Sequence, residues 1–240
     1  GMTERGMGAA VGQDPEIACM VVEWVMEVAT IPVITKLTPN VHSVVPTGRS
    51  VVKAGTNALS LINTIQSVTG IDLDTLVPNP YVAGKSVFGG YCGPAVKPIA
   101  LKMLTTIAQD EVTNKVPISG IGGVSTWKDA VEFMLLGASN VQVCTAAMNY
   151  GFRIVDDMIE GMNNWMDDKG FKTLNDFIGK SVEKITHWDA RNPSVVKKDI
   201  PQDVHLVIML TNFLNHNAMN KFKNEAKRKT IEFICAKRSE

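Results

Sequence analysis

The feature that most constrains the fold is a regular alternation of short apolar segments with longer amphipathic ones. The short segments are rich in valine and isoleucine and have the length of β-strands. Each is followed by a segment with helical periodicity, and this order produces parallel βαβ units. Because the short segments are apolar throughout, we expect the sheet to be covered on both faces. The four predicted strands are 31–37, 57–64, 116–120 and 140–146.

The helices are predicted from their periodicity and their end signals. Asp14-Pro15 is expected to open the first one, with Asp14 as the N-cap. Residues 65–93 are rich in Asp, Pro and Gly and are predicted to be one long loop, which is a kind of segment that often carries function. The predicted helices are 15–29, 46–55, 93–110, 126–138, 152–170 and 173–179.

The number of strands sets the architecture. A complete (β/α)8 barrel needs eight parallel strands in about 250 residues. We therefore predict an α/β fold of the TIM (β/α)8 barrel family, here about the last four βα units, over residues 1–190. Residues 191–240 are apolar first and basic later, and are expected to form a helical C-terminal tail. An open half-barrel exposes two sheet edges and an inner apolar face, which predicts a homo-oligomer or another form of self-association.

The overall charge excludes some classes of partner. Lys+Arg and Asp+Glu are equal at 24, which argues against nucleic acid or an anionic membrane surface as the main partner. The chain has no apolar run of about 18 residues and no visible signal peptide. Its four cysteines are far apart and lack metal-ligand spacing. These features predict a cytoplasmic protein with reduced thiols and no metal site.

Glycines and a small polar residue follow the last two predicted strands. Gly122 and Gly123 follow the strand that ends at Gly120, and Cys144-Thr145 lies at the end of the next one. Phosphate sites of α/β barrels favour the ends of the seventh and eighth strands, where backbone N–H groups can face an anion. The pattern therefore predicts a phosphate-binding cradle. The alternative is that the glycines only form tight turns.

Polar residues also end the first two predicted strands. Lys36 ends an apolar strand, where a cation is costly unless it is paired or functional, so we expect it to face an anionic or electron-accepting ring. Asn63 and Thr64 end the next strand and could hydrogen-bond a planar polar substrate. The alternatives are that Lys36 is an ordinary surface lysine and that Asn63 and Thr64 only cap a turn. Cys92 is expected to be an ordinary buried thiol.

Six segments of the chain keep an order and spacing that are found in a known family. They are GMTERGMGAAVGQDPE, IPVITKLTPNV, LINTI, KSVFGGYCGPAVKPIAL, PISGIGG and QVCTA. Together these segments resemble the FMN-binding, pyrimidine-reducing domain of the dihydropyrimidine dehydrogenase family, more specifically the subunit that carries this domain in the bacterial-type NAD-dependent enzyme. The resemblance extends over about residues 1–190. GMTERGMG and GGYCGPAVKP favour this family over the dihydroorotate dehydrogenases.

The resemblance implies a cofactor, a reaction and a set of roles. Lys36 would contact the FMN ring, and Asn63 and Thr64 would hold a pyrimidine base. The enzyme reduces the 5,6 double bond of uracil or thymine with electrons from NAD(P)H. FAD and iron–sulfur clusters on other domains or on a partner subunit deliver these electrons. The residues expected around the FMN ribityl chain and phosphate are Gly93, Gly122, Gly123, Cys144 and Thr145.

The chain also departs from the family pattern. The family's catalytic cysteine precedes the segment equivalent to Gly1-Met2, so no catalytic residue is expected in this chain. Residues 191–240 lack CxxCxxC motifs and are not expected to bind iron–sulfur clusters. The family's mobile substrate loop would correspond to residues 1–13. The alternative function is a non-catalytic fragment or interaction module with weak binding of FMN or phosphate.

Overall fold

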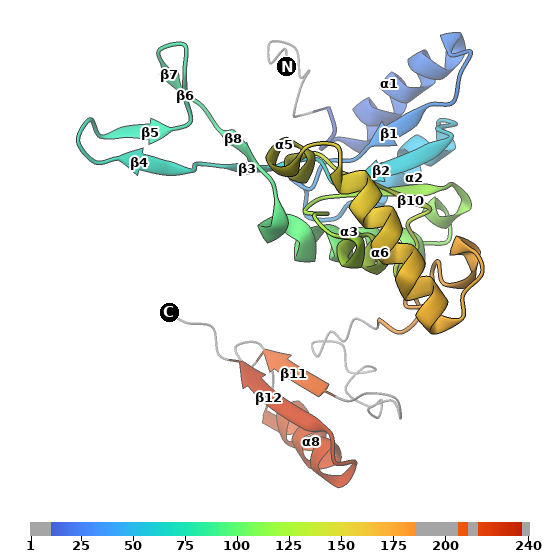
Figure 1. Cartoon of the computed structure of the whole chain (residues 1–240). Helices are drawn as coiled ribbons and strands as arrows, with labels where there is room; N and C mark the ends of the chain where they lie inside the picture. Colours follow the sequence, from blue (N-terminus) through green and yellow to red (C-terminus); the bar gives the residue numbers. More distant parts are fainter. Residues whose placement is uncertain (1–10, 186–205, 211–215, 237–240) are drawn as a thin grey trace. The chain divides into compact units, whose positions relative to one another are not determined.

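The computed structural model describes residues 11–185, 206–210 and 216–236. The chain divides into two compact units, Gly1–Ile185 and Thr186–Glu240 (Figure 1). Most of the segment expected as a mobile substrate loop, residues 1–10, lies outside the described residues. The same holds for residues 186–205, which contain the expected boundary between barrel and tail.

A four-stranded sheet of order β1-β2-β9-β10 forms the centre of the first unit. All three pairings between neighbours are parallel, as the alternation of strands and helices predicts. The observed strands are shorter than the predicted ones. Some of the polar residues that were expected at the strand ends lie beyond the paired residues, and others lie among them. The bounds are β1 Ile34–Lys36, β2 Ala58–Leu61, β9 Ile118–Ile121 and β10 Asn140–Gln142.

Helices follow the strands close to the predicted positions. The Asp14 carboxylate caps the first helix by accepting from the N–H groups of Glu16 and Ile17, as expected. The α-helices of this unit are α1 Pro15–Val28, α2 Val45–Lys53, α3 Lys97–Gln109, α4 Trp127–Leu135, α5 Thr145–Tyr150 and α6 Ile154–Lys169. In residues 11–185, three short 3-10 helices accompany them: η1 Pro94–Val96, η2 Thr113–Lys115 and η3 Leu174–Asp176. Residues 173–179 therefore contain a 3-10 turn where a helix was expected.

The apolar core lies between the sheet and its helices. Leu59 and Leu61 of β2 are fully buried against this layer. Gly120 of β9 faces the same side, and a Cβ there would lie 2.5 Å from the ring of Phe133 on α4. The absence of a side chain at Gly120 therefore lets α4 pack directly on the strand.

The opposite, inner face of the sheet is polar at its centre, so the expectation of an apolar inner face is wrong. Lys36, Ser60 and Ser119 lie in one register row. The Gln142 side-chain amide donates to the hydroxyls of Ser60 at 2.8 Å and Ser119 at 2.7 Å. Strand periodicity alone misses this row, because a serine within an apolar run does not reveal which face it occupies.

Residues 65–91 form an arm of antiparallel ribbons, not the single loop that was predicted (Figure 1). Its strands are too short to show clear alternation, and its turn residues resemble those of a loop. At one turn the Asp72 carboxylate accepts from the N–H groups of Asp74 and Thr75. The pairs are β3 Ile65–Ser67 with β8 Gly89–Tyr91, β4 Gly70–Asp72 with β5 Val77–Asn79, and β6 Tyr81–Val82 with β7 Lys85–Ser86.

In the second unit, where a helical tail was expected, the described residues contain one helix and two strands, and the strands were not expected. The helix α8 spans His216–Arg228, between β11 Leu206–Leu210 and β12 Glu232–Ala236. The two strands pair in parallel. Both are short apolar runs, which periodicity alone cannot distinguish from buried helix. None of the helices in the described parts of either unit is long and apolar enough to cross a membrane.

Candidate functional site

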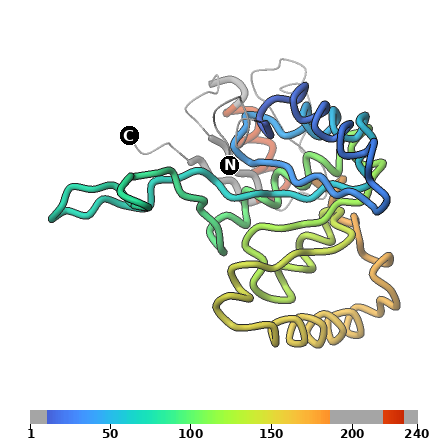
Figure 2. Tube along the Cα trace, turned by 90° about the horizontal axis from the view of Figure 1, so that it is seen from above, coloured from blue at the N-terminus to red at the C-terminus, as the bar shows by residue number. Residues whose placement is uncertain are grey.

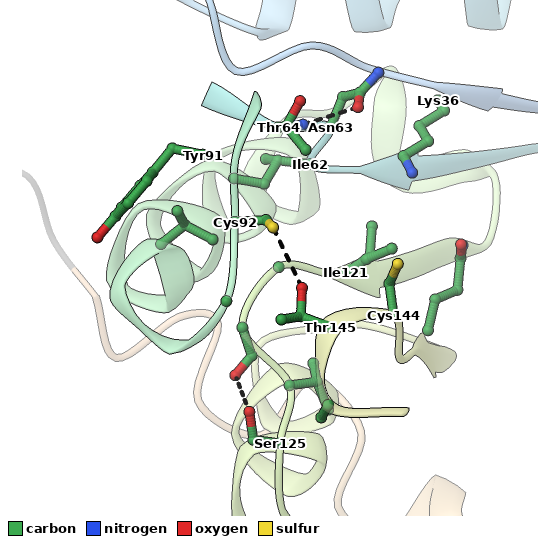
Figure 3. A pocket seen from close by; sticks show the side chains of 17 residues that line it. Lys36, Ile62, Asn63, Thr64, Tyr91, Cys92, Ile121, Ser125, Cys144 and Thr145 are labelled. Atoms are coloured by element: carbon green, nitrogen blue, oxygen red, sulfur yellow. Dashed lines mark hydrogen bonds between the residues drawn. The ribbon is translucent and has the colours of Figure 1, made fainter. Parts of the chain in front are cut away.

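A cavity of about 110 Å³ lies at the carboxyl ends of the four parallel strands (Figure 3). Loops that follow different strands contribute its walls, so residues far apart in the sequence meet there. The eight residues singled out from the sequence all line it: Lys36, Asn63, Thr64, Gly93, Gly122, Gly123, Cys144 and Thr145. This is the end of a parallel sheet at which α/β proteins bind ligands.

A second cavity, of about 410 Å³, shares Lys36, Asn63 and Thr64 with the first. Lys36 ends β1 as predicted, and its side chain is exposed. Asn63 follows β2, where its backbone N–H donates to the Leu37 carbonyl at 3.0 Å. The Asn63 side-chain oxygen accepts from the Thr64 N–H at 2.8 Å. The Asn63 amide nitrogen therefore remains as a donor for a ligand.

The glycine loop after β9 is packed too tightly to carry side chains. Gly123 has φ +78°, and a Cβ there would lie 2.8 Å from the Gly93 carbonyl oxygen and 2.9 Å from Lys97 Cβ. Gly122 has φ +131°, and its Cβ would lie 2.8 Å from that of Ala100. Both backbone conformations favour glycine. Packing against the start of α3 thus requires these glycines, and it leaves bare backbone facing the cavity.

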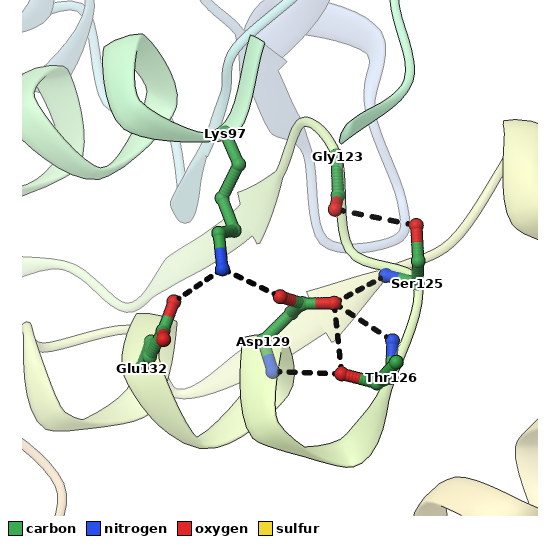
Figure 4. A network of polar contacts seen from close by, with 6 residues as sticks. All are labelled: Lys97, Gly123, Ser125, Thr126, Asp129 and Glu132. Carbon is green, nitrogen blue, oxygen red and sulfur yellow. Dashed lines mark hydrogen bonds and ion pairs between the residues drawn. The ribbon is translucent and has the colours of Figure 1, made fainter. Parts of the chain in front are cut away.

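A polar network fixes the same loop to the helices beneath it (Figure 4). Asp129 and Thr126 form a capping box at the start of α4. Asp129 Oδ2 also accepts from the Ser125 N–H at 3.0 Å, and the Ser125 hydroxyl donates to the Gly123 carbonyl at 3.4 Å. Lys97 on α3 contacts Asp129 at 2.6 Å and Glu132 at 2.8 Å. The loop is therefore held in place independently of any ligand.

These contacts shift two ionisation equilibria. Burial alone would raise the pKa of Asp129, but hydrogen bonds from Lys97, the Ser125 N–H and Thr126 outweigh it and lower the pKa. Hydrogen bonds to Asp129 and Glu132 raise the pKa of Lys97. Both groups are charged at neutral pH, and Lys97 is already paired. It is therefore a structural cation beneath the loop.

The cysteines near the cavity differ from expectation. Cys92 is exposed and not buried, and its Sγ accepts from the Thr145 hydroxyl at 3.3 Å. Cys144 is also exposed. It lies between the end of β10 at Gln142 and the start of α5. Across the described ranges, no group of three or more His, Cys, Asp or Glu side chains could hold a metal ion.

Sequence reasoning missed two lining residues of the cavity whose side chains form hydrogen bonds. Gln142 lines the cavity and anchors the serine row, and Ser125 lines the cavity near the glycine loop. Gln142 could have been found, because a glutamine in a short apolar strand of a covered sheet needs hydrogen-bond partners. Ser125 carried no signal beyond its nearness to the glycines.

Comparison with known proteins gives two family matches and a set of related enzymes. The dihydroorotate dehydrogenase family matches residues 4–166. A family described as uncharacterised proteins conserved in bacteria matches residues 167–240. The NAD-dependent dihydropyrimidine dehydrogenase subunit PreA of Escherichia coli K12 is 42% identical over 184 residues, which are 77% of this chain and 45% of that protein.

Two further relatives are named for two different enzyme activities. The chloroplastic dihydropyrimidine dehydrogenase (NADP(+)) of Arabidopsis thaliana is 44% identical over 193 residues, 79% of this chain and 45% of that protein. The catalytic subunit of dihydroorotate dehydrogenase B (NAD(+)) from Pyrococcus furiosus is 40% identical over 175 residues, 73% of this chain and 56% of that protein. The chain thus spans about half the length of the relatives it matches.

Proposed function

Because this chain belongs to the dihydroorotate dehydrogenase family, we propose that it forms part of an FMN-dependent dihydropyrimidine dehydrogenase. The enzyme would reduce the 5,6 double bond of uracil or thymine with electrons from NADH or NADPH. Family members are flavin oxidoreductases with a TIM-barrel fold and FMN as cofactor. The observation that carries the proposal is the single cavity that gathers all eight residues expected around flavin and substrate.

The residues that line the two cavities fit FMN. The narrower cavity has the glycine loop on one side and the Thr145 hydroxyl near it, which suits a phosphate and a polyol chain. The wider cavity has a volume in the range typical of sites for small molecules. Lys36, which lines both, provides a cation for the flavin ring. We assign Gly93, Gly122, Gly123, Cys144 and Thr145 to the ribityl and phosphate end.

The chemistry that bound FMN would supply is a hydride for one carbon of the 5,6 double bond, while the other carbon would accept a proton. The residues of this chain would bind the FMN and the pyrimidine and orient them relative to each other. Lys36 offsets the negative charge of the electron-rich ring. The Asn63 amide N–H donates to a carbonyl oxygen of the pyrimidine, since its amide oxygen is already used by Thr64. Thr64 adds a hydroxyl beside it. We assign the proton transfer to no residue of this chain.

The electrons would arrive from a partner that carries a flavin and iron–sulfur clusters, on another chain or on another domain. The described residues of the second unit, 206–210 and 216–236, contain one cysteine, Cys235, and therefore cannot coordinate a cluster by themselves. The Escherichia coli relative is itself named as one subunit of a larger enzyme, which supports this division of labour.

The first test is a titration of the purified chain with FMN, followed by quenching of flavin fluorescence. We expect saturable binding in the micromolar range. Thr145→Glu places a carboxylate where the phosphate would bind and should weaken binding at least tenfold by like-charge repulsion. Thr106→Glu, at a half-buried position on α3 outside the cavity, should leave it unchanged. If the Thr145→Glu variant bound FMN as tightly as the wild type, this would contradict the assignment of Thr145 to the phosphate end.

The second test separates the two activities found among the relatives. FMN bound to the chain is reduced with dithionite, and its reoxidation is followed by absorbance after uracil, thymine or orotate is added. Reoxidation by uracil or thymine supports the proposed reaction, and reoxidation by orotate alone contradicts it. FMN binding without any turnover would fit the alternative, a non-catalytic module that binds FMN, and it would equally fit a proton donor that lies outside this chain.

A further inference from the structure

Asn40 lies in the loop between β1 and α2, where it lines the wider cavity but not the narrower one. The residue is half-buried. Its side-chain nitrogen donates to the Thr64 carbonyl at 3.0 Å and to the Thr38 hydroxyl at 3.1 Å. Its side-chain oxygen accepts from the Gln66 N–H at 2.8 Å. Both amide hydrogens and the amide oxygen therefore have partners, and two of these partners lie beyond β2 in the chain.

These partners determine which side chain can occupy this position. The Thr64 carbonyl can only accept a hydrogen bond, and the Gln66 N–H can only donate one. The side chain between them must offer a donor to one and an acceptor to the other, as an asparagine amide does. An aspartate of the same size would keep the acceptor but would place a carboxylate oxygen against the Thr64 carbonyl oxygen.

The contacts of Asn40 hold the turn that carries the proposed substrate residues. Asn63 and Thr64 lie side by side in this turn, and the Asn63 side-chain oxygen accepts from the Thr64 N–H at 2.8 Å (Figure 3). The N–H of Thr64 is therefore held by Asn63, and its carbonyl is held by Asn40. The direction in which the Asn63 amide faces a ligand consequently depends on Asn40, although Asn40 uses its own amide elsewhere.

Asn40 also anchors the root of the arm. Figure 2 shows the arm, residues 65–91, extending away from the sheet and helices of the first unit. Gln66, which donates to Asn40, belongs to β3 and pairs with Gly90 of β8 at this root. A Cβ at Gly90 would collide with the Thr64 side chain, so the root packs directly on the turn. The arm and the turn thus share one attachment.

The segment before α1 is attached to the same residue. The Gln13 side-chain amide donates to the backbone carbonyl of Asn40 at 2.9 Å. Val11 and Gly12, which precede it, line the wider cavity. Three parts of the wall of this cavity therefore meet at Asn40, namely this segment, the turn at Thr64 and the root of the arm. These parts come from three separate regions of the sequence, and the hydrogen bonds of one residue join them.

We propose that Asn40 is a positioning residue for the substrate end of the site, and that it sets the affinity for the pyrimidine and not the affinity for FMN. This inference rests on the proposed function, in which Asn63 and Thr64 hold the pyrimidine. The phosphate end of the site has its own support, because the network around Asp129 holds the glycine loop. A change at Asn40 should therefore separate the two ligands, whereas a general loss of the fold would affect both.

The test compares two changes of equal size in the purified chain, Asn40→Asp and Asn57→Asp. Asn57 is the matched control, because its side-chain oxygen accepts from the Val33 N–H at 2.7 Å and an aspartate keeps this acceptor. It lines neither cavity. Uracil binding to the FMN-loaded chain is followed by the change in the flavin absorption spectrum. Asn40→Asp should weaken uracil binding by about tenfold or more and leave FMN affinity within about threefold. Asn57→Asp should change neither affinity.

Hydrogen exchange of the chain without FMN examines the same contacts without any ligand. Residues 62–67 should exchange about tenfold faster in Asn40→Asp than in the wild type, because the turn and the root of the arm lose an anchor. Residues 154–169 of α6 should be unaffected, which checks that the variant is folded. An unchanged uracil affinity, an equal loss of uracil and FMN affinity, or unchanged exchange at residues 62–67 would overturn the proposal. If the wild-type chain binds no uracil, the proposed function is contradicted, and the exchange experiment decides the role of Asn40 by itself.

Discussion

Gly123 illustrates how one residue connects packing to the proposed cofactor site. Its positive φ and the nearby Gly93 carbonyl leave no room for a Cβ. A methyl group can be accommodated only if the loop moves away from α3. The loop faces the cavity, so such a movement changes the shape of the site as well as the stability of the fold.

We expect Gly123→Ala to weaken FMN binding at least tenfold and to lower the free energy of unfolding by about 1–3 kcal/mol. Gly170→Ala is the control, because Gly170 has a similar φ of +72° but no atom within 4 Å of an added Cβ. The control should lose stability without losing affinity. Fluorescence titration and urea unfolding measure the two effects. Equal FMN affinity of both variants would contradict the role of the loop.

At the residue scale, sequence reasoning found residues that occupy strand ends. Lys36, Asn63 and the glycine loop were recognisable because polar or glycine residues directly follow apolar strands, and parallel strands bring such ends together. The exposure of Cys92 and the hydrogen bonds of Gln142 depend on which face a side chain occupies. The tertiary fold determines which face a side chain occupies, and the sequence of a three-residue strand does not reveal that face.

At the scale of elements, the capping box of α4 joins the helix, the glycine loop and α3. Asp129 is the common acceptor. In the folded protein the pKa of Asp129 lies below its ordinary value of 3.8, because hydrogen bonds to the carboxylate outweigh burial. Its contribution to stability is therefore complete above about pH 3.8 and is lost as the pH falls through the lower folded-state pKa.

Asp129→Asn should lower the free energy of unfolding by about 1–2 kcal/mol at neutral pH, since it removes the charge from a cap and an ion pair. The difference from wild type should shrink as the pH falls below 3.8. Denaturant unfolding at several pH values measures both effects. Glu160→Gln, at an exposed position on α6, is the control and should change stability little. A pH-independent difference would refute the account.

The elements themselves were predictable where their periodicity is long. The helices α1, α3, α4 and α6 were recovered, because each spans several turns of one apolar side. The arm and the two strands of the second unit were not. Their strands are two to five residues long, and over that length a strand, a loop and a piece of buried helix have similar compositions. In these short segments, pairing with another strand determines which of these structures forms.

At the scale of the molecule, the two compact units give a test of cofactor binding by stability. A ligand that binds only the folded state stabilises it by about 2.7 kcal/mol at one hundred times its dissociation constant. FMN at that level should raise the unfolding temperature of the first unit by several degrees. The second unit should not respond. Calorimetry with and without FMN checks this, and riboflavin, which lacks the phosphate, should produce a smaller shift.

The long separation within one strand pair also has a consequence for the order of folding. The pairing of β2 with β9 joins Leu59 to Ile118, with the whole arm between them in the chain. Contacts this distant in sequence form slowly, whereas the ribbons of the arm close locally and early. The cavity cannot exist until β2 and β9 have paired. In a refolding experiment, flavin quenching would therefore appear after the secondary structure and would mark the completion of the sheet.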